Sequence, residues 1–122
     1  MGIAKEKLEK IVEKMNVKPK VEQVFITDIA GKPVDWDMVF QFKLDNEDPF
    51  FIEIRTRKVR VLEGKASEPD ILMTGDNKAL VRICEGKGDF THAISREEIT
   101  VEKGKVIEVI RLTRAITTAL RG

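Results

Sequence analysis

The chain is poor in the residues that build covalent and metal frameworks. Its 122 residues include one cysteine, Cys84, and one histidine, His92. A single cysteine excludes an intramolecular disulfide framework. With only one histidine and one cysteine, the chain also cannot form a zinc cluster of the usual His/Cys spacing. We therefore expect neither a metal nor a cofactor.

A large net charge is also absent. Twenty-two Lys and Arg residues balance 21 Asp and Glu residues, which leaves a formal net charge of +1. This balance gives no global attraction to nucleic acid, so we expect no nucleic-acid partner. The many Lys, Glu and Arg residues occur with only two glutamines, Gln23 and Gln41, and this composition indicates a thermophilic source.

Long apolar runs are missing as well. No stretch approaches the ~18 uninterrupted apolar residues that a membrane span requires. The N-terminal sequence MGIAKEKLEKIVEKM has no apolar run of the signal-peptide type. Glu6 stands where a myristoylation signal favours Ser or Thr. We expect a cytoplasmic protein.

The residues that are present predict one α+β domain over residues 1–122. Apolar positions at helical spacing predict amphipathic helices over residues 3–15 and 106–120. Asp76 is a suitable N-cap for a helix that ends at Gly86, and Asp89 is a suitable cap for a short helix containing Phe90, Ala93 and Ile94. Pro19 is expected to end the first helix.

Alternating apolar residues predict the strands. The clearest alternation runs from Val34 to Leu44, with Val39 as the one apolar exception between the alternating positions. A turn near residues 56–58 must shift the register between two later strands, because their apolar positions change from even to odd numbers. The expected strands cover residues 21–29, 34–44, 50–54, 59–61, 71–73 and 99–102.

The number of large apolar side chains on these elements has two interpretations. The best strands and the last helix present more large apolar side chains than a narrow seam requires, which is typical of a sheet that encloses an apolar ligand. The same side chains could instead fill a dry core, and on composition alone this second interpretation is the commoner one. Periodicity predicts an apolar layer and does not by itself predict a cavity.

An ordered series of segments resembles the sterol carrier protein family, most strongly over residues 39–112. The series runs Val39–Leu44, an acidic turn, Phe51–Ile54, Val59–Gly64, Glu68–Asp76, Ala79-Leu80, Glu85-Gly86 and Ile99–Glu102. Two positions depart from the family pattern. Glu97 stands where a glycine usually precedes the last strand, and Lys103-Gly104 replaces the usual Gly-Asp after it. The stretch from Val17 to Asp37 is also longer than the family pattern.

The resemblance implies a mainly antiparallel five-stranded sheet flanked by helices, with a hydrophobic tunnel between them. Such a tunnel would take a fatty acid, a fatty acyl-CoA, a sterol or an isoprenoid lipid. The candidate ligand-binding residues, mapped by position, are Phe40, Phe42, Ile52, Ile54, Leu80, Ile83, Phe90, Ile94, Val109, Ile110 and Leu112.

No set of residues predicts catalysis. Cys84 lies on the apolar side of its helix and is expected to be a buried, inert thiol. His92 has no second histidine and is expected at the surface or at a cap. Asp35 and Asp37 would share one strand face as a carboxylate pair, but the wet side of a strand whose other side carries Trp36 and Met38 explains them better. Gly86-Lys87-Gly88-Asp89 lacks the spacing of a phosphate loop. We expect no enzymatic activity.

The C-terminal segment carries a local positive charge. From Lys103 to Gly122 there are five basic residues and one acid, Glu108. Basic residues late in a helix oppose its dipole, and this structural explanation can be sufficient by itself. The functional hypothesis is that Arg111, Arg114 and Arg121 meet anionic lipid headgroups at a membrane surface, or the phosphates of a CoA-type ligand.

The sequence therefore predicts an intracellular lipid-binding or lipid-transfer protein. The alternative is a non-catalytic accessory or dimerisation module that presents lipid or acyl-CoA to a partner enzyme. The oligomeric state stays open between a monomer, a homodimer and a complex with that enzyme.

Overall fold

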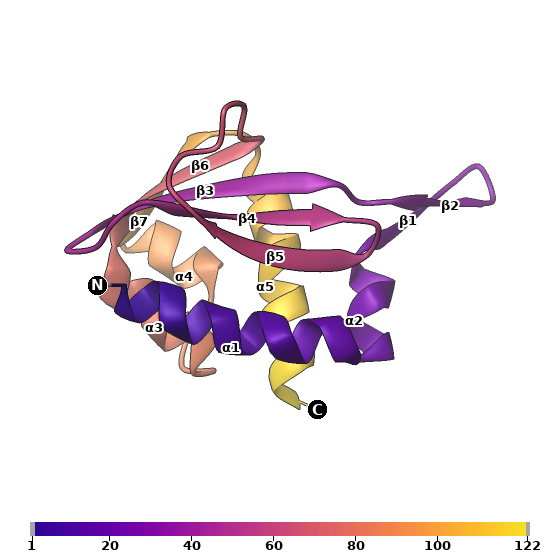
Figure 1. Cartoon of the computed structure of the whole chain (residues 1–122), viewed down its shortest axis with the longest axis horizontal. Coiled ribbons are helices and arrows are strands. Elements are labelled where there is room, and N and C mark those ends of the chain that lie inside the picture. The colour runs from indigo at the N-terminus through magenta and orange to yellow at the C-terminus, as the bar shows by residue number, and fades with distance from the viewer. Residues whose placement is uncertain (1, 122) are drawn as a thin grey trace.

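A five-stranded sheet with its helices on one side forms the body of the protein (Figure 1). The computed structural model describes residues 2–121. The strands are β3 (Met38–Asp45), β4 (Phe50–Arg55), β5 (Lys58–Glu63), β6 (Ile71–Asp76) and β7 (Ile99–Lys103), in the spatial order β5-β4-β3-β6-β7. Only the β3–β6 pair is parallel among them. The predicted α+β class and mainly antiparallel sheet are confirmed.

The sheet presents its alternating apolar side chains to the helices. Phe40 and Phe42 of β3 and Ile52 of β4 are fully buried, and Phe42 stacks on its cross-strand partner Phe50 with ring centroids 5.0 Å apart. Cross-strand aromatic pairs stabilise a sheet beyond the area they bury. The predicted apolar layer therefore lies between the sheet and the helices.

The other face of the sheet is partly covered by the segment that joins β5 to β6. The Gln41 side chain donates to the Phe50 and Gly64 carbonyl groups at 2.9 and 3.0 Å, and it accepts from the Ala66 N–H at 2.7 Å. Asp70 accepts from the Val39 N–H at 2.8 Å. These contacts explain why Val39 and Gln41 are buried although neither belongs to the helix-facing series.

The predicted turn near residues 56–58 is a two-residue hairpin. Thr56 and Arg57 both have positive φ, at 48° and 66°, which is the signature of a type I′ turn. Because Arg55 pairs with Lys58, even-numbered residues of β4 face odd-numbered residues of β5. The change from even to odd apolar positions follows from this pairing.

Five helices cover the sheet. They are α1 (Ile3–Val17), α2 (Pro19–Val24), α3 (Asn77–Cys84), α4 (Phe90–Ser95) and α5 (Val106–Arg121). The predicted caps are confirmed, since Asp76 accepts from the Lys78 N–H and Asp89 accepts from the His92 N–H. Glu47, distant in sequence, binds the start of α1 by accepting from the N–H groups of Ala4 and Lys5 at 3.1 and 3.3 Å. No helix within residues 2–121 is long and apolar enough to cross a membrane.

The predicted strand over residues 21–29 is wrong in its first half, which forms α2. Pro19 ends α1 as predicted, since α1 stops at Val17 and Lys18 is extended, but it also occupies the first turn of α2, where a missing N–H costs nothing. Val21 and Val24 are buried at helical spacing, so tertiary burial outweighs the strand preference of β-branched residues. The strand begins only at Ile26.

The predicted continuous strand over residues 34–44 is also wrong, because the chain divides it at Trp36. The first part joins a separate two-stranded sheet of β1 (Ile26–Ile29) and β2 (Lys32–Asp35), and the second part is β3. Trp36 is buried, and its backbone N–H donates to the Phe25 carbonyl at 2.8 Å. Asp35 and Asp37 therefore do not share a strand face. Asp35 instead pairs with Arg57 at 2.8 Å.

Candidate functional site: a groove beside the last helix

Ten of the eleven predicted ligand-binding residues lie together in the layer between sheet and helices. Nine of them are at most 2 % exposed, and Ile94 packs against the same core cluster while partly buried. The exception is Ile110, which is 38 % exposed and faces away from this layer. The layer is contributed by β3, β4, α3, α4 and α5, as the resemblance implies. Whether a lipid occupies it stays a prediction.

An open groove lies where Ile110 emerges, between α5 and the segment that joins α2 to β1. Its volume is about 610 Å³. One wall comes from the first turns of α5 and the other from the end of α2 and the start of β1. The lining residues are Gln23, Val24, Ile26, Thr27, Asp28, Ile107, Glu108, Ile110, Arg111 and Arg114.

Arg111 joins the two walls of the groove. Its Nε donates to the Val24 carbonyl at 2.7 Å, and a terminal nitrogen donates to the Ile26 carbonyl at 3.1 Å. Its guanidinium lies over the Trp36 ring, 4.4 Å from the ring centroid, as a cation–π contact. Burial lowers the pKa of Arg111, and the neighbouring Glu108 carboxylate opposes this shift.

Trp36 connects the groove to the buried layer. Its indole N–H donates to Glu108 Oε2, so Trp36 holds α5 from the same side as Arg111. Beneath it, Phe25 stacks on the Trp36 ring at 6.2 Å and Phe40 meets it edge-on at 5.8 Å. An aromatic row thus runs from the groove to Phe40, one of the predicted ligand-binding residues.

The three arginines of the C-terminal hypothesis do not form one site. Arg111 is engaged by two carbonyl groups and a ring, and Arg114 is exposed at the edge of the groove. Arg121 lies ten residues beyond Arg111, about 15 Å along the helix axis, and does not line the groove. Of these side chains, Arg114 has the position and exposure to meet an anionic group.

Sequence reasoning missed Trp36 and Glu108 as site residues. Glu108 and Arg111 are spaced i, i+3 on one helix, so their proximity was readable from the sequence. The insertion of Trp36 against them was not readable, because it depends on the break between β2 and β3.

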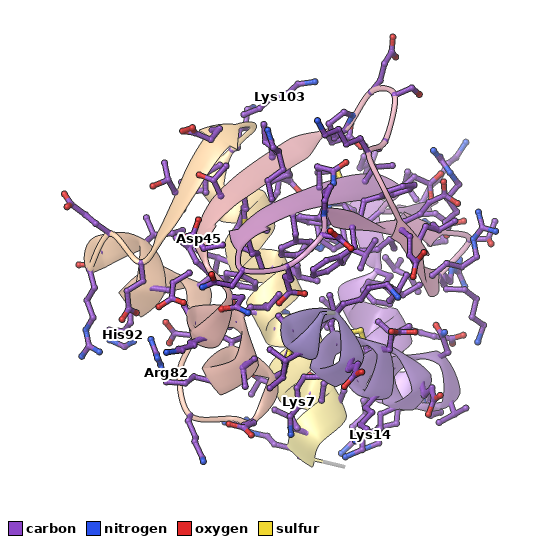
Figure 2. The ribbon with its side chains drawn as sticks, turned by 60° about the vertical axis from the view of Figure 1, so that its left-hand side comes forward. Lys7, Lys14, Asp45, Arg82, His92 and Lys103 are labelled. Atoms are coloured by element: carbon purple, nitrogen blue, oxygen red, sulfur yellow. The ribbon has the colours of Figure 1, made fainter. Side chains whose placement is uncertain are left out.

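Cys84 is buried and His92 is exposed, as the sequence predicts. Cys84 is 4 % exposed, and burial raises the pKa of its thiol to about 12, with a smaller contribution from Glu85. His92 is exposed on the outside of α4, with its Nδ1 3.0 Å from Asp89 Oδ1 (Figure 2). Within the described part of the chain, no group of three His, Cys, Asp or Glu side chains could hold a metal ion.

Comparison with solved structures supports the fold assignment. The chain is similar to a protein described as "UbiJ-SCP2 Ubiquinone synthesis protein", with 14 % identity, a TM-score of 0.67, and coverage of 91 % of this chain and 90 % of that one. It is similar to palmitated SCP2L2 from Aedes aegypti, with 17 % identity, a TM-score of 0.64 and 95 % coverage of both chains. The apo form of sterol carrier protein 2 from Yarrowia lipolytica matches with 14 % identity, a TM-score of 0.58, and coverage of 94 % and 91 %.

Sequence comparison assigns the family. A search of curated proteins gave no significant match. Residues 4–104 match the SCP-2 sterol transfer family. Because this match spans far more than half of the 122 residues, the chain belongs to the SCP-2 sterol transfer family.

Proposed function

We propose that this protein binds a lipid with a single long apolar chain and carries it through water. The observation that carries the proposal is the groove beside α5. Exposed Ile107 and Ile110 line it, and its residues Glu108 and Arg111 contact Trp36, which in turn meets Phe40 of the apolar layer. The family assignment supports lipid binding, and one structural neighbour is described as palmitated. Burial of the lipid chain, at roughly 25 cal/mol per Å², supplies the driving force.

The buried layer has to open to accept such a chain. Its side chains are packed at close to zero exposure, so a lipid tail displaces them or moves α5 away from the sheet. Trp36, Glu108 and Arg111 hold the first half of α5 to the base of the β1–β2 hairpin. We propose that these contacts break during uptake and re-form around the bound chain, as expected for a gated site.

The polar end of the ligand is proposed to stay at the groove. The exposed guanidinium of Arg114 offers a partner for a carboxylate or phosphate there. The Asp28 carboxylate on the opposite wall disfavours a second negative charge on the ligand near that wall. A fatty acid, with one carboxylate and one tail, fits this arrangement better than an uncharged sterol.

A blocking substitution tests the proposal. Ile110→Trp enlarges a side chain that lines the groove and is 38 % exposed, so it fills the groove with little disturbance of the core. Ile3→Trp is the matched control, since Ile3 is 52 % exposed and lies at the start of α1. Fluorescent fatty acid is titrated in aqueous buffer without vesicles. We expect at least about tenfold weaker binding by Ile110→Trp and unchanged binding by Ile3→Trp.

Equal affinity of wild type and both variants would place the ligand elsewhere. Absence of binding by the wild-type protein would remove the carrier function altogether. In that case the second candidate, a non-catalytic accessory module that presents lipid to a partner enzyme, takes its place. This second candidate is favoured by the similarity to the UbiJ-SCP2 protein, whose description refers to ubiquinone synthesis. It predicts stable co-purification with that enzyme.

A further inference from the structure

Exposed aliphatic side chains are concentrated on the β1–β2 hairpin and at the start of α5, and two of them, Ile107 and Ile110, line the groove. Seven large apolar side chains of the described residues are strongly exposed, and five of them belong to the β1–β2 hairpin or to the start of α5. We call these five the aliphatic rim: Ile29 (56 % exposed), Val34 (43 %), Val106 (43 %), Ile107 (69 %) and Ile110 (38 %). Scattered apolar residues on a surface need no explanation, but a concentration of them on the two elements that flank one groove does.

The rim residues belong to two elements, the β1–β2 hairpin and the first turns of α5. Figure 1 shows the β1–β2 hairpin extending beyond the five-stranded sheet. Val34 pairs across this hairpin with Thr27, and Thr27 lines the groove together with Ile107 and Ile110. The base of the hairpin and the first turns of α5 therefore flank the same groove. The hairpin lies between α2 and β3, within the stretch from Val17 to Asp37 that the family resemblance leads us to expect as an extension.

Basic side chains accompany the aliphatic rim. Lys32 is exposed at the hairpin tip, Lys105 is exposed just before α5, and Arg114 is exposed at the edge of the groove. Of the nearby acids, Glu108 accepts from Trp36 and Asp35 pairs with Arg57, so three exposed cations outnumber the exposed Asp28 on the hairpin. Aliphatic side chains surrounded by Lys and Arg are complementary to the interface of a membrane that contains anionic lipid.

We propose that the aliphatic rim docks on an anionic membrane surface, so that the groove opens directly onto the lipid from which the ligand is taken. This inference rests on the proposed function for its purpose, but the docking itself can be measured separately. A protein partner fits the surface less well. Protein interfaces are enriched in aromatic residues and depleted in lysine, whereas every rim residue is Ile or Val and two of the three nearby cations are lysines.

The test is vesicle flotation of the full chain with two lipid compositions. The vesicles contain phosphatidylcholine alone or phosphatidylcholine with one third phosphatidylglycerol. The double variant Ile29→Ser/Val34→Ser removes the two exposed aliphatic side chains of the hairpin, neither of which lines the groove, and Ile3→Ser/Val17→Ser is the matched control at two exposed positions of α1. We expect wild type and control to float with the anionic vesicles, and the rim variant to bind at least about tenfold more weakly.

A second readout separates docking from ligand binding. Transfer of a fluorescent fatty acid from anionic vesicles is compared with its uptake from free solution. We expect the rim variant to lose transfer of the fatty acid from vesicles and to keep uptake of the fatty acid from free solution. Equal flotation of the rim variant and wild type would overturn the docking surface, as would flotation of neither. If wild type floats through its rim but takes up no fatty acid from solution, the proposed function fails while the docking surface stands.

Discussion

Replacing Arg111 by methionine should loosen the first half of α5. Methionine keeps an unbranched apolar stem against Trp36 but removes the donors to the Val24 and Ile26 carbonyl groups and the cation–π contact. Each hydrogen bond contributes about 1 kcal/mol net at a partly exposed site, and the cation–π contact adds about 0.5–1 kcal/mol. The expected loss of unfolding free energy is therefore about 2–3 kcal/mol.

This loss is measurable by urea denaturation and by calorimetry. For a chain of this length each kcal/mol lowers Tm by about 3–5 °C, so we expect a decrease of about 6–15 °C. Arg114→Met is the matched control, because Arg114 is one turn further along α5 and exposed. Its expected effect is below about 0.5 kcal/mol.

The same variant also tests the role of α5 in ligand uptake. If Arg111 helps to keep α5 closed, Arg111→Met should take up fluorescent fatty acid faster than wild type in stopped-flow mixing. Hydrogen exchange should also accelerate in the first half of α5, since local opening becomes easier. Identical stability of Arg111→Met and Arg114→Met would refute the reasoning about these contacts. Unchanged uptake kinetics in a destabilised Arg111→Met would show that α5 does not control uptake.

Three further predictions concern other parts of the fold. Glu97→Gly should stabilise the protein by about 0.5–1 kcal/mol in urea denaturation, because Glu97 has φ of 60° and glycine adopts this conformation without a Cβ clash; a loss of stability would contradict this. Glu47→Ala should cost about 2 kcal/mol and expose the Ala4 and Lys5 N–H groups to exchange, whereas Glu47→Gln should recover part of the loss, since an amide oxygen still accepts. The raised thiol pKa of Cys84, about 12 against an ordinary value near 9, contributes stability that is fully present below pH 9 and is lost between pH 9 and 12, as the unfolded chain ionises first. The difference in unfolding free energy between wild type and Cys84→Ala should therefore shrink by about 1 kcal/mol between pH 9 and 10, and a constant difference would refute the shift.

Sequence periodicity predicted the parts of the fold that are decided locally. The alternation through Phe40 and Phe42 requires one buried strand face, and Asp76 and Asp89 can cap the helices that follow them whatever the tertiary context. The glycine that the family places before its last strand also has a physical reason. Glu97 at that position has positive φ, which the residue type itself does not reveal.

The parts that sequence did not predict depend on distant contacts. Val21 and Val24 favour a strand by residue type, but burial against the core makes the segment helical. Trp36 continues the alternation of its neighbours and still breaks the strand, because its ring packs between Phe25 and Arg111. The groove lies between two segments that are far apart in the sequence, so no local pattern could have located it. Ile110 was predicted as an apolar ligand-binding position of the last helix, but its place at the groove was not.

The most direct test of the account is native mass spectrometry after gentle purification, followed by lipid extraction. The account predicts a population carrying close to one lipid per chain, with a mass that corresponds to a long-chain acyl or isoprenoid compound. It also predicts that Ile110→Trp purifies with less of that lipid than Ile3→Trp. A clean apo mass for the wild-type chain, together with no uptake of fluorescent fatty acid, would contradict lipid carriage by this protein.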